Sequence, residues 1–212
     1  LRAVTVALPA AERRVGQERM ADLVAAAIET GRHLVVPAGT GTGKTLAYLV
    51  PAIGAGARVV VATATKALQD QLATKDLPFL AAAVPEQFSW SVLKGRSNYL
   101  CMQRLREMHG GGEGQLALED LAAPTIAELT RLARWAGESD TGDMAELDWS
   151  PSEQAWRSVS VSSEECPGAD RCPSGDICFA ERARRRAAES DVIVVNTHLY
   201  GLHVGSGGVI LP

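Results

Sequence analysis

A glycine-rich octapeptide, AGTGTGKT at residues 38–45, constrains the fold of this chain more than any other segment. It follows a short apolar run at residues 33–37 and precedes a stretch with helical character. Glycines let successive backbone N–H groups turn inward around phosphate oxygens, and the positive end of a following helix faces the same anion. Apart from Ala38, which replaces the first glycine, the pattern is that of a Walker A loop. We therefore predict a strand–loop–helix unit that binds a nucleoside triphosphate.

Two residues of this loop have predicted catalytic roles. Lys44 is expected to reach the β- and γ-phosphates as a point charge, and Thr45 to hold Mg²⁺ through its hydroxyl. A chance glycine-rich turn is the alternative, but strand, loop, Gly-Lys-Thr and helix occur here in the required order. The predicted phosphate-binding residues are Ala38, Gly39, Thr40, Gly41, Thr42, Gly43, Lys44 and Thr45.

Hydrophobic periodicity predicts an α/β fold. Apolar residues recur at helical spacing from Gln17 to Thr30, and Gly31 is the expected stop. Further helices are predicted at 66–77, 125–136 and 179–190. Short β-branched or apolar runs predict buried strands at 33–37, 58–63, 90–93 and 191–196. Alternating strands and helices at both ends of the chain indicate a parallel sheet flanked by helices, with the middle of the chain inserted into it.

The middle of the chain holds all four cysteines. Sixty-four residues separate Cys101 from Cys166, and Cys172 and Cys178 follow at five-residue intervals. The charged N-terminus is not a secretory signal, so a cytoplasmic location is expected and a metal site is favoured over disulfides. Four thiolates can hold zinc or an iron–sulfur cluster. Structural zinc sites favour closer spacing, so the cluster is preferred, while zinc and four unrelated buried cysteines remain alternatives.

Charge is unevenly distributed along the chain. Residues 113–153 contain ten acidic and two basic residues, a net charge of −8, so the remainder carries +4 of the total −4. Mild overall acidity therefore does not exclude an anionic partner such as nucleic acid.

Several segments, taken in order, resemble the iron–sulfur DNA helicases of the DinG/XPD group in superfamily two. The segment ERRVGQ resembles the adenine-recognising segment of that family, read as Arg-x-x-Gln, and AGTGTGKT resembles its motif I. ATATKALQDQL is similar to motif Ia, and LKGRSNYLC to the stretch that delivers the first cluster ligand. CPGADRCPSGDICFAERAR resembles the stretch that carries the other three ligands, and DVIVVNTHLY the strand and turn that follow the insertion.

The resemblance implies a RecA-like P-loop NTPase lobe with an inserted iron–sulfur domain. Its expected parts are residues 1–93 and 179–212 for the lobe and 94–178 for the insertion. Arg14 and Gln17 would read adenine. The implied ligands of a [4Fe–4S] cluster are Cys101, Cys166, Cys172 and Cys178.

The implied activity is that of an ATP-dependent DNA helicase. The resemblance implies ATP, Mg²⁺ and single-stranded DNA as ligands, 5′→3′ movement, and a role in repair or replication. We expect a monomer at the nucleoid in the cytoplasm that acts on forked or damaged duplexes and not on a membrane. Because the sequence contains no Asp-Glu-Ala-His, we expect a fragment that ends before this motif and is inactive alone.

Two other functions are considered. One is a zinc-stabilised nucleic-acid-binding module with a vestigial P-loop. The other is a different P-loop enzyme, such as a small-molecule kinase. The four-cysteine insertion and the segment similar to motif Ia argue against the kinase.

Overall fold

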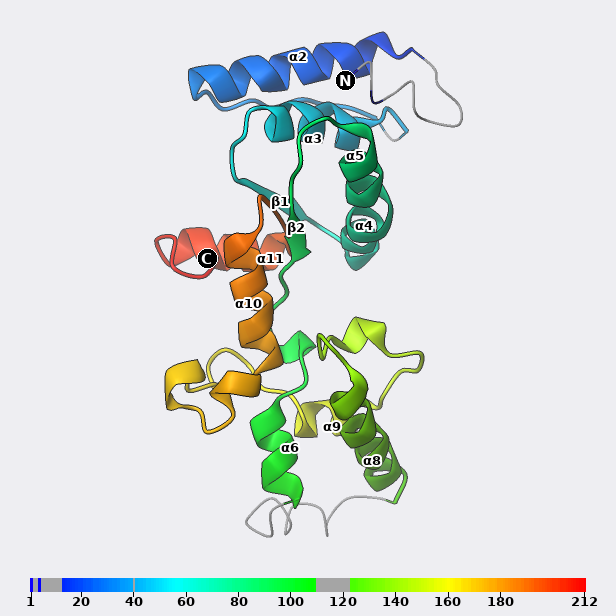
Figure 1. Ribbon diagram of the computed structural model, residues 1–212, viewed down its shortest axis with the longest axis vertical. Coiled ribbons are helices and arrows are strands. Elements are labelled where there is room, and N and C mark those ends of the chain that lie inside the picture. Colours follow the sequence, from blue (N-terminus) through cyan, green and yellow to red (C-terminus); the bar gives the residue numbers. More distant parts are fainter. Residues whose placement is uncertain (2–3, 5–12, 40, 110–122) are drawn as a thin grey trace. The chain divides into compact units, whose positions relative to one another are not determined.

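The computed structural model describes residues 1, 4, 13–39, 41–109 and 123–212. Thr40 of the glycine-rich loop, Glu12, and the acidic residues Glu113, Glu119 and Asp120 lie outside this description. Two compact units are present (Figure 1). The first comprises Leu1–Val92 and Ala187–Leu211, and the second comprises Leu93–Arg186 together with Pro212. Within the described ranges, no helix is long and apolar enough to cross a membrane.

A parallel three-stranded sheet forms the centre of the first unit. Its strands are β1 (Val59–Thr63), β2 (Trp90–Val92) and β3 (Val192–Asn196), in the order β1-β3-β2. The first four residues of β3 are all buried, as expected for a central strand covered on both faces. The predicted strands at 58–63, 90–93 and 191–196, and their parallel arrangement, are therefore confirmed.

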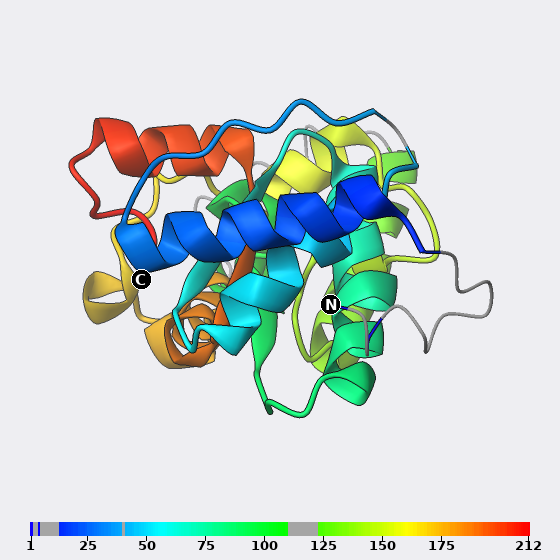
Figure 2. The same ribbon diagram turned by 90° about the horizontal axis from the view of Figure 1, so that it is seen from above.

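Helices flank this sheet, consistent with a RecA-like lobe. Helix α2 (Val15–Thr30) packs along α3 (Lys44–Gly54), as Figure 1 shows from the side and Figure 2 from above. Gly31 adopts a left-handed conformation, φ +64°, and ends α2 as predicted. Helices α4 (Lys66–Gln71) and α11 (Thr197–Gly205) both contact β1 and β3.

One hydrophobic core joins helices and sheet in the first unit. Leu49 and Ile53 of α3 belong to the same buried cluster as Val61 of β1 and Val194 of β3. Because α3 begins at Lys44, burial of its apolar residues holds the end of the glycine-rich loop on the sheet.

The predicted strand at residues 33–37 is wrong. Residues 32–39 form neither helix nor strand, and the side chain of Val35 is 92% exposed. A strand forms only when its backbone groups are paired, and the three described strands pair with one another and not with this segment. Pro37 also has no N–H to donate to a neighbouring strand. The apolar composition was therefore not sufficient to make this segment a strand.

The predicted helix at 66–77 is present, but it is longer and contains a wide turn. A π-helical turn, η1 (Leu72–Asp76), connects α4 to α5 (Leu77–Ala83). Pro78 lies in the first turn of α5, where its missing N–H costs least. The helix thus continues for six residues beyond the prediction.

The second unit consists mainly of helices and short 3₁₀ turns. The helices at 125–136 and 179–190 were predicted and are observed as α8 (Ala123–Glu138) and α10 (Phe179–Glu189), the latter belonging to this unit up to Arg186. Helices α6 (Met102–His109) and α9 (Glu153–Ser158) were not predicted. Trp156 of α9 is buried, and its indole N–H donates to the carbonyl oxygen of Ser97 at 2.8 Å. The 3₁₀ turns are η2 (Arg96–Asn98), η3 (Met144–Glu146), η4 (Ala169–Arg171) and η5 (Gly175–Ile177).

Asp191 and Ser89 join the starts of β3 and β2. The amide and hydroxyl of Ser89 donate to the Asp191 carboxylate at 2.7 and 2.8 Å, which lowers the pKa of Asp191. We expect Ser89→Ala to lower the free energy of unfolding by about 1 kcal/mol or less. Because the pKa of Asp191 is lowered on folding, this loss should be full above pH 3.8 and shrink as the pH falls below it. Urea unfolding of both proteins at pH 7 and pH 3 measures the difference, and a pH-independent loss would contradict it.

Candidate functional site

The glycine-rich loop leads directly into the first turn of α3. Gly41 and Gly43 both have φ +74°, a left-handed conformation that favours glycine. Gly43 is the N-cap of α3, and no side chain caps the first turn. The amides at this helix end are therefore not occupied by a side-chain cap, as an anion-binding turn requires.

The side chain of Lys44 turns back onto its own loop. Its Nζ atom donates to the carbonyl oxygens of Ala38 at 3.1 Å and Gly39 at 2.6 Å. The hydroxyl of Thr42 also donates to the Gly39 carbonyl, at 3.0 Å. All of these bonds use carbonyl oxygens of the loop, so none of them consumes an amide donor that a phosphate needs. The loop carbonyls thus hold the ammonium group of Lys44 beside the segment where phosphates are expected.

The first turn of α2 supports the loop from a second direction. The guanidinium of Arg14, the N-cap residue of α2, donates to the carbonyl oxygen of Gly41. The amide nitrogen of Gln17, which is 6% exposed, donates to the carbonyl oxygen of Gly43 at 2.9 Å. The structure therefore brings both residues of the Arg-x-x-Gln segment to the glycine-rich loop.

Tyr48 is a neighbour of Thr45 that the sequence reasoning did not identify. The two residues are three positions apart on α3, and their hydroxyl groups form a hydrogen bond. Burial raises the pKa of Tyr48, and the bond to Thr45 partly opposes that shift. Tyr48 therefore places a second hydroxyl group beside the side chain expected to hold Mg²⁺. The i, i+3 spacing on a helix was the available signal.

Gly43 has no room for a side chain. A Cβ atom at this position would lie 2.2 Å from the Gln17 side-chain nitrogen, and its φ of +74° disfavours other residues. We expect Gly43→Ala to weaken nucleotide binding by about tenfold or more, because both the loop backbone and the Gln17 contact must shift. Gly54→Ala, at the other end of α3 with no atom within 4 Å of its Cβ, is the matched control. Titration with a fluorescent ATP analogue measures both, and equal affinities would contradict the prediction.

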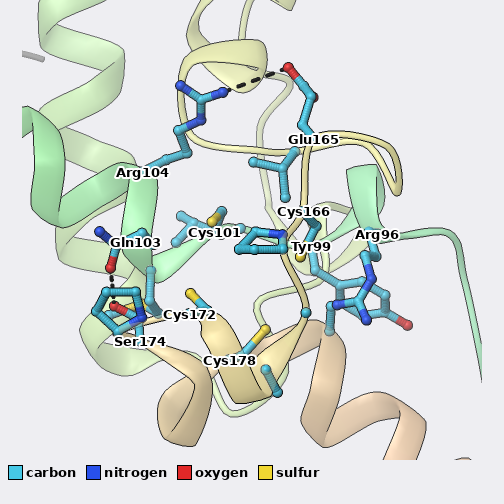
Figure 3. A pocket seen from close by; sticks show the side chains of 18 of the residues that line it. Arg96, Tyr99, Cys101, Gln103, Arg104, Glu165, Cys166, Cys172, Ser174 and Cys178 are labelled. Atoms are coloured by element: carbon cyan, nitrogen blue, oxygen red, sulfur yellow. Dashed lines mark hydrogen bonds and ion pairs between the residues drawn. The ribbon is translucent and has the colours of Figure 1, made fainter.

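The four cysteines line a single cavity of about 420 Å³ in the second unit. Figure 3 shows their sulfur atoms around a common space. All four are free thiols. Cys101 immediately precedes α6, and Cys178 immediately precedes α10. The fold thus brings Cys101 together with three cysteines that follow it after 64 or more intervening residues.

The four cysteines line the walls of this cavity. Within the described ranges, no three His, Cys, Asp or Glu side chains are grouped closely enough to hold a metal ion. Burial raises the pKa of the Cys101 thiol, while the backbone amides of Arg104 and Gln103 oppose this shift. Cys101 is therefore a half-buried thiol that faces the N-terminal amides of α6.

Polar contacts connect the walls of this cavity. Arg104 and Glu165 form an ion pair of 3.6 Å on one side, and Ser174 donates to Gln103 at 2.9 Å on the other (Figure 3). The two 3₁₀ turns η4 and η5 also pack closely, since a Cβ on Gly175 would lie 2.2 Å from the carbonyl oxygen of Ala169. No sequence pattern predicts these contacts. The side-chain partners are distant along the chain, and the contact between Gly175 and Ala169 involves a backbone carbonyl.

Comparisons with known proteins agree with the nucleotide-binding geometry. Residues 18–109, which include the glycine-rich loop, match the DEAD/DEAH box helicase family model. The whole chain is similar to the ATP-dependent helicase DinG of Mycobacterium tuberculosis, at 44% identity over 227 residues that make up 34% of that protein.

Two further relatives extend this similarity. The ATP-dependent DNA helicase YoaA of Escherichia coli is 42% identical over 195 residues, which cover 92% of this chain and 30% of YoaA. The 3′-5′ exonuclease DinG of Bacillus subtilis is 31% identical over 217 residues, which cover all of this chain and 22% of that protein. The chain spans about a third or less of the length of these relatives.

Proposed function

Since the chain belongs to the DinG and YoaA group of DEAD/DEAH box helicase homologues, we propose that it is the nucleotide-binding and four-cysteine part of an ATP-dependent DNA helicase. One observation carries this proposal: the similarity to ATP-dependent helicases extends over the whole chain, and so includes both the glycine-rich loop and the cysteine cavity. A small-molecule kinase would share only the loop.

The loop of the first unit binds the phosphates of ATP in this proposal. The loop amides and Lys44 hold the phosphate oxygens, and Thr45 holds Mg²⁺. Arg14 and Gln17 recognise adenine. Their observed bonds to the carbonyls of Gly41 and Gly43 support this role, because they place both side chains beside the loop. The glycine-rich loop then contacts both the phosphates and the two residues that recognise the base.

The cysteine cavity holds a [4Fe–4S] cluster in this proposal. One observation supports the fit: four free thiols from separate segments of the chain line one cavity. Cys101, Cys166, Cys172 and Cys178 are the proposed ligands. When bound, such a cluster crosslinks the segments that carry its ligands and is capable of one-electron exchange.

The DNA substrate follows from the relatives named as DNA helicases. We propose 5′→3′ movement of the complete protein on single-stranded DNA, as a monomer that separates forked or damaged duplexes during repair or replication. We place it at the nucleoid in the cytoplasm. Thr65 of the segment similar to motif Ia caps α4 by accepting from the Leu68 amide, which assigns its hydroxyl to the helix end.

Strand displacement by the full-length protein tests this proposal. Labelled duplexes with either a 5′ or a 3′ single-stranded tail are mixed with protein, Mg²⁺ and ATP, or with a non-hydrolysable ATP analogue as control. We expect displacement of the 5′-tailed duplex when ATP is present and no displacement with the non-hydrolysable analogue. Displacement only from the 3′-tailed duplex would overturn the direction. Nucleotide binding without any displacement would overturn the helicase function.

A further inference from the structure

A directional chain of hydrogen bonds runs beside the cysteine cavity. Nη1 of Arg106 donates to the Ser174 hydroxyl at 3.0 Å, and that hydroxyl donates to Oε1 of Gln103 at 2.9 Å. Nε2 of Gln103 then donates to the carboxylate of Glu107 at 3.0 Å. The chain starts on a cation and ends on an anion, so each bond polarises the next in the same direction. Ser174 is the member of this chain that lies outside α6, and it accepts one hydrogen bond from that helix and donates another to it.

Ser174 connects the elements that carry three of the four cysteines. Gln103 and Arg106 lie on α6, which begins directly after Cys101. Ser174 lies on the loop between Cys172 and Cys178 and is only 2% exposed. Its two hydrogen bonds therefore hold this loop against α6, with the serine itself buried and its partners on α6 partly open to solvent.

We propose that Ser174 is a positioning residue for the four-cysteine site. Its hydroxyl fixes the Cys172–Cys178 loop against α6, and this contact sets where the sulfur of Cys101 lies relative to the sulfurs of Cys172 and Cys178. The inference rests on the proposed cluster, because a defined arrangement of sulfurs matters most when they share one bound group. Residues that orient metal ligands in this way commonly contribute about 10- to 100-fold to retention of the metal.

The other contact across the cavity is expected to contribute less. Arg104 and Glu165 also connect α6 to a cysteine segment, but their side chains are 45% and 55% exposed. Solvent-exposed ion pairs add little, because water and salt screen them. The Ser174 side chain, in contrast, is buried, so loss of its hydroxyl removes two hydrogen bonds that are shielded from water on the serine side. Arg104→Ala is therefore the matched control for Ser174→Ala.

The experiment measures how fast purified protein loses its cluster. Iron and labile sulfide are first quantified in the wild-type protein under argon. Visible absorbance is then followed after addition of an iron chelator. We expect Ser174→Ala to lose the absorbance about tenfold faster than wild type. Ser174→Thr, which keeps the hydroxyl, should restore most of the retention, and Arg104→Ala should stay within about twofold of wild type.

Further variants separate positioning from a general loss of stability. Gln103→Met removes the acceptor of the Ser174 hydroxyl. The double variant that combines Ser174→Ala with Gln103→Met should lose the cluster no faster than Ser174→Ala alone. If Ser174→Ala is insoluble, Gln103→Met decides the question in the same assay. The inference would be overturned if Ser174→Ala and Gln103→Met both lost the cluster at the wild-type rate, or if Ser174→Thr did not restore retention of the cluster. Wild-type protein without iron and sulfide would instead overturn the proposed cluster before any variant is compared.

Discussion

Replacement of Lys44 by alanine is expected to abolish ATP hydrolysis and to leave the four-cysteine site intact. The ammonium group of Lys44 is held at the loop by the carbonyl oxygens of Ala38 and Gly39. No other basic residue of the octapeptide can supply a charge to the β- and γ-phosphates. Removal of a charge that stabilises phosphoryl transfer costs on the order of 100-fold or more in rate. DNA-stimulated phosphate release by the full-length protein measures the effect.

Lys75→Ala is the matched control for this prediction. Lys75 is exposed in η1 and lies outside the glycine-rich loop, so its removal changes the net charge equally without changing the proposed site. We expect Lys75→Ala to hydrolyse ATP at nearly the wild-type rate. Iron content should be unchanged in both variants, because Lys44 belongs to the first unit and the cysteines to the second. Wild-type hydrolysis by Lys44→Ala would contradict the assigned role.

Cys172→Ser is expected to remove the bound cluster and DNA unwinding together. Serine has nearly the same shape, but its hydroxyl does not ionise near neutral pH and cannot replace a thiolate ligand. We expect the iron content to fall by about tenfold or more and strand displacement to disappear.

Nucleotide binding serves as the internal control in the cysteine variant. The glycine-rich loop is supported by a core of α3, β1 and β3, which contains none of the four cysteines. Affinity for the ATP analogue should therefore stay within about twofold of wild type. The same pattern is expected for serine at each of the other three cysteines, since all four line one cavity. A variant that keeps its iron would show that its cysteine is not a ligand.

Local patterns predicted much of the fold correctly. The apolar stripe of α2, its stop at Gly31, and the β-branched runs of β1 and β3 are short-range signals, and all of these elements formed. The segment at 33–37 failed because an apolar run becomes a strand only when a partner strand is present. Helix α6 was missed because MQRLREMH is short and mostly polar, so it offers few apolar residues from which a helix could be predicted.

Contacts between distant segments could not be predicted in the same way. Glycine spacing identifies a phosphate-binding loop, but the bonds from Arg14 to Gly41 and from Gln17 to Gly43 depend on how α2 packs on α3. Likewise, the cysteine spacing predicts a shared site. The link from Ser174 to Gln103 spans 71 positions, and only the folded chain reveals it.

Metal and sulfide analysis of anaerobically purified protein determines whether the four cysteines hold an iron–sulfur cluster. We expect about four iron atoms and four labile sulfides per chain, with a broad visible absorbance and a brown colour. This result would support a single cluster on the four cysteines and, with the helicase relatives, an iron–sulfur DNA helicase. One zinc ion per chain without sulfide would contradict the cluster and favour a zinc-stabilised nucleic-acid-binding module, with nucleotide binding by the glycine-rich loop as the remaining proposal.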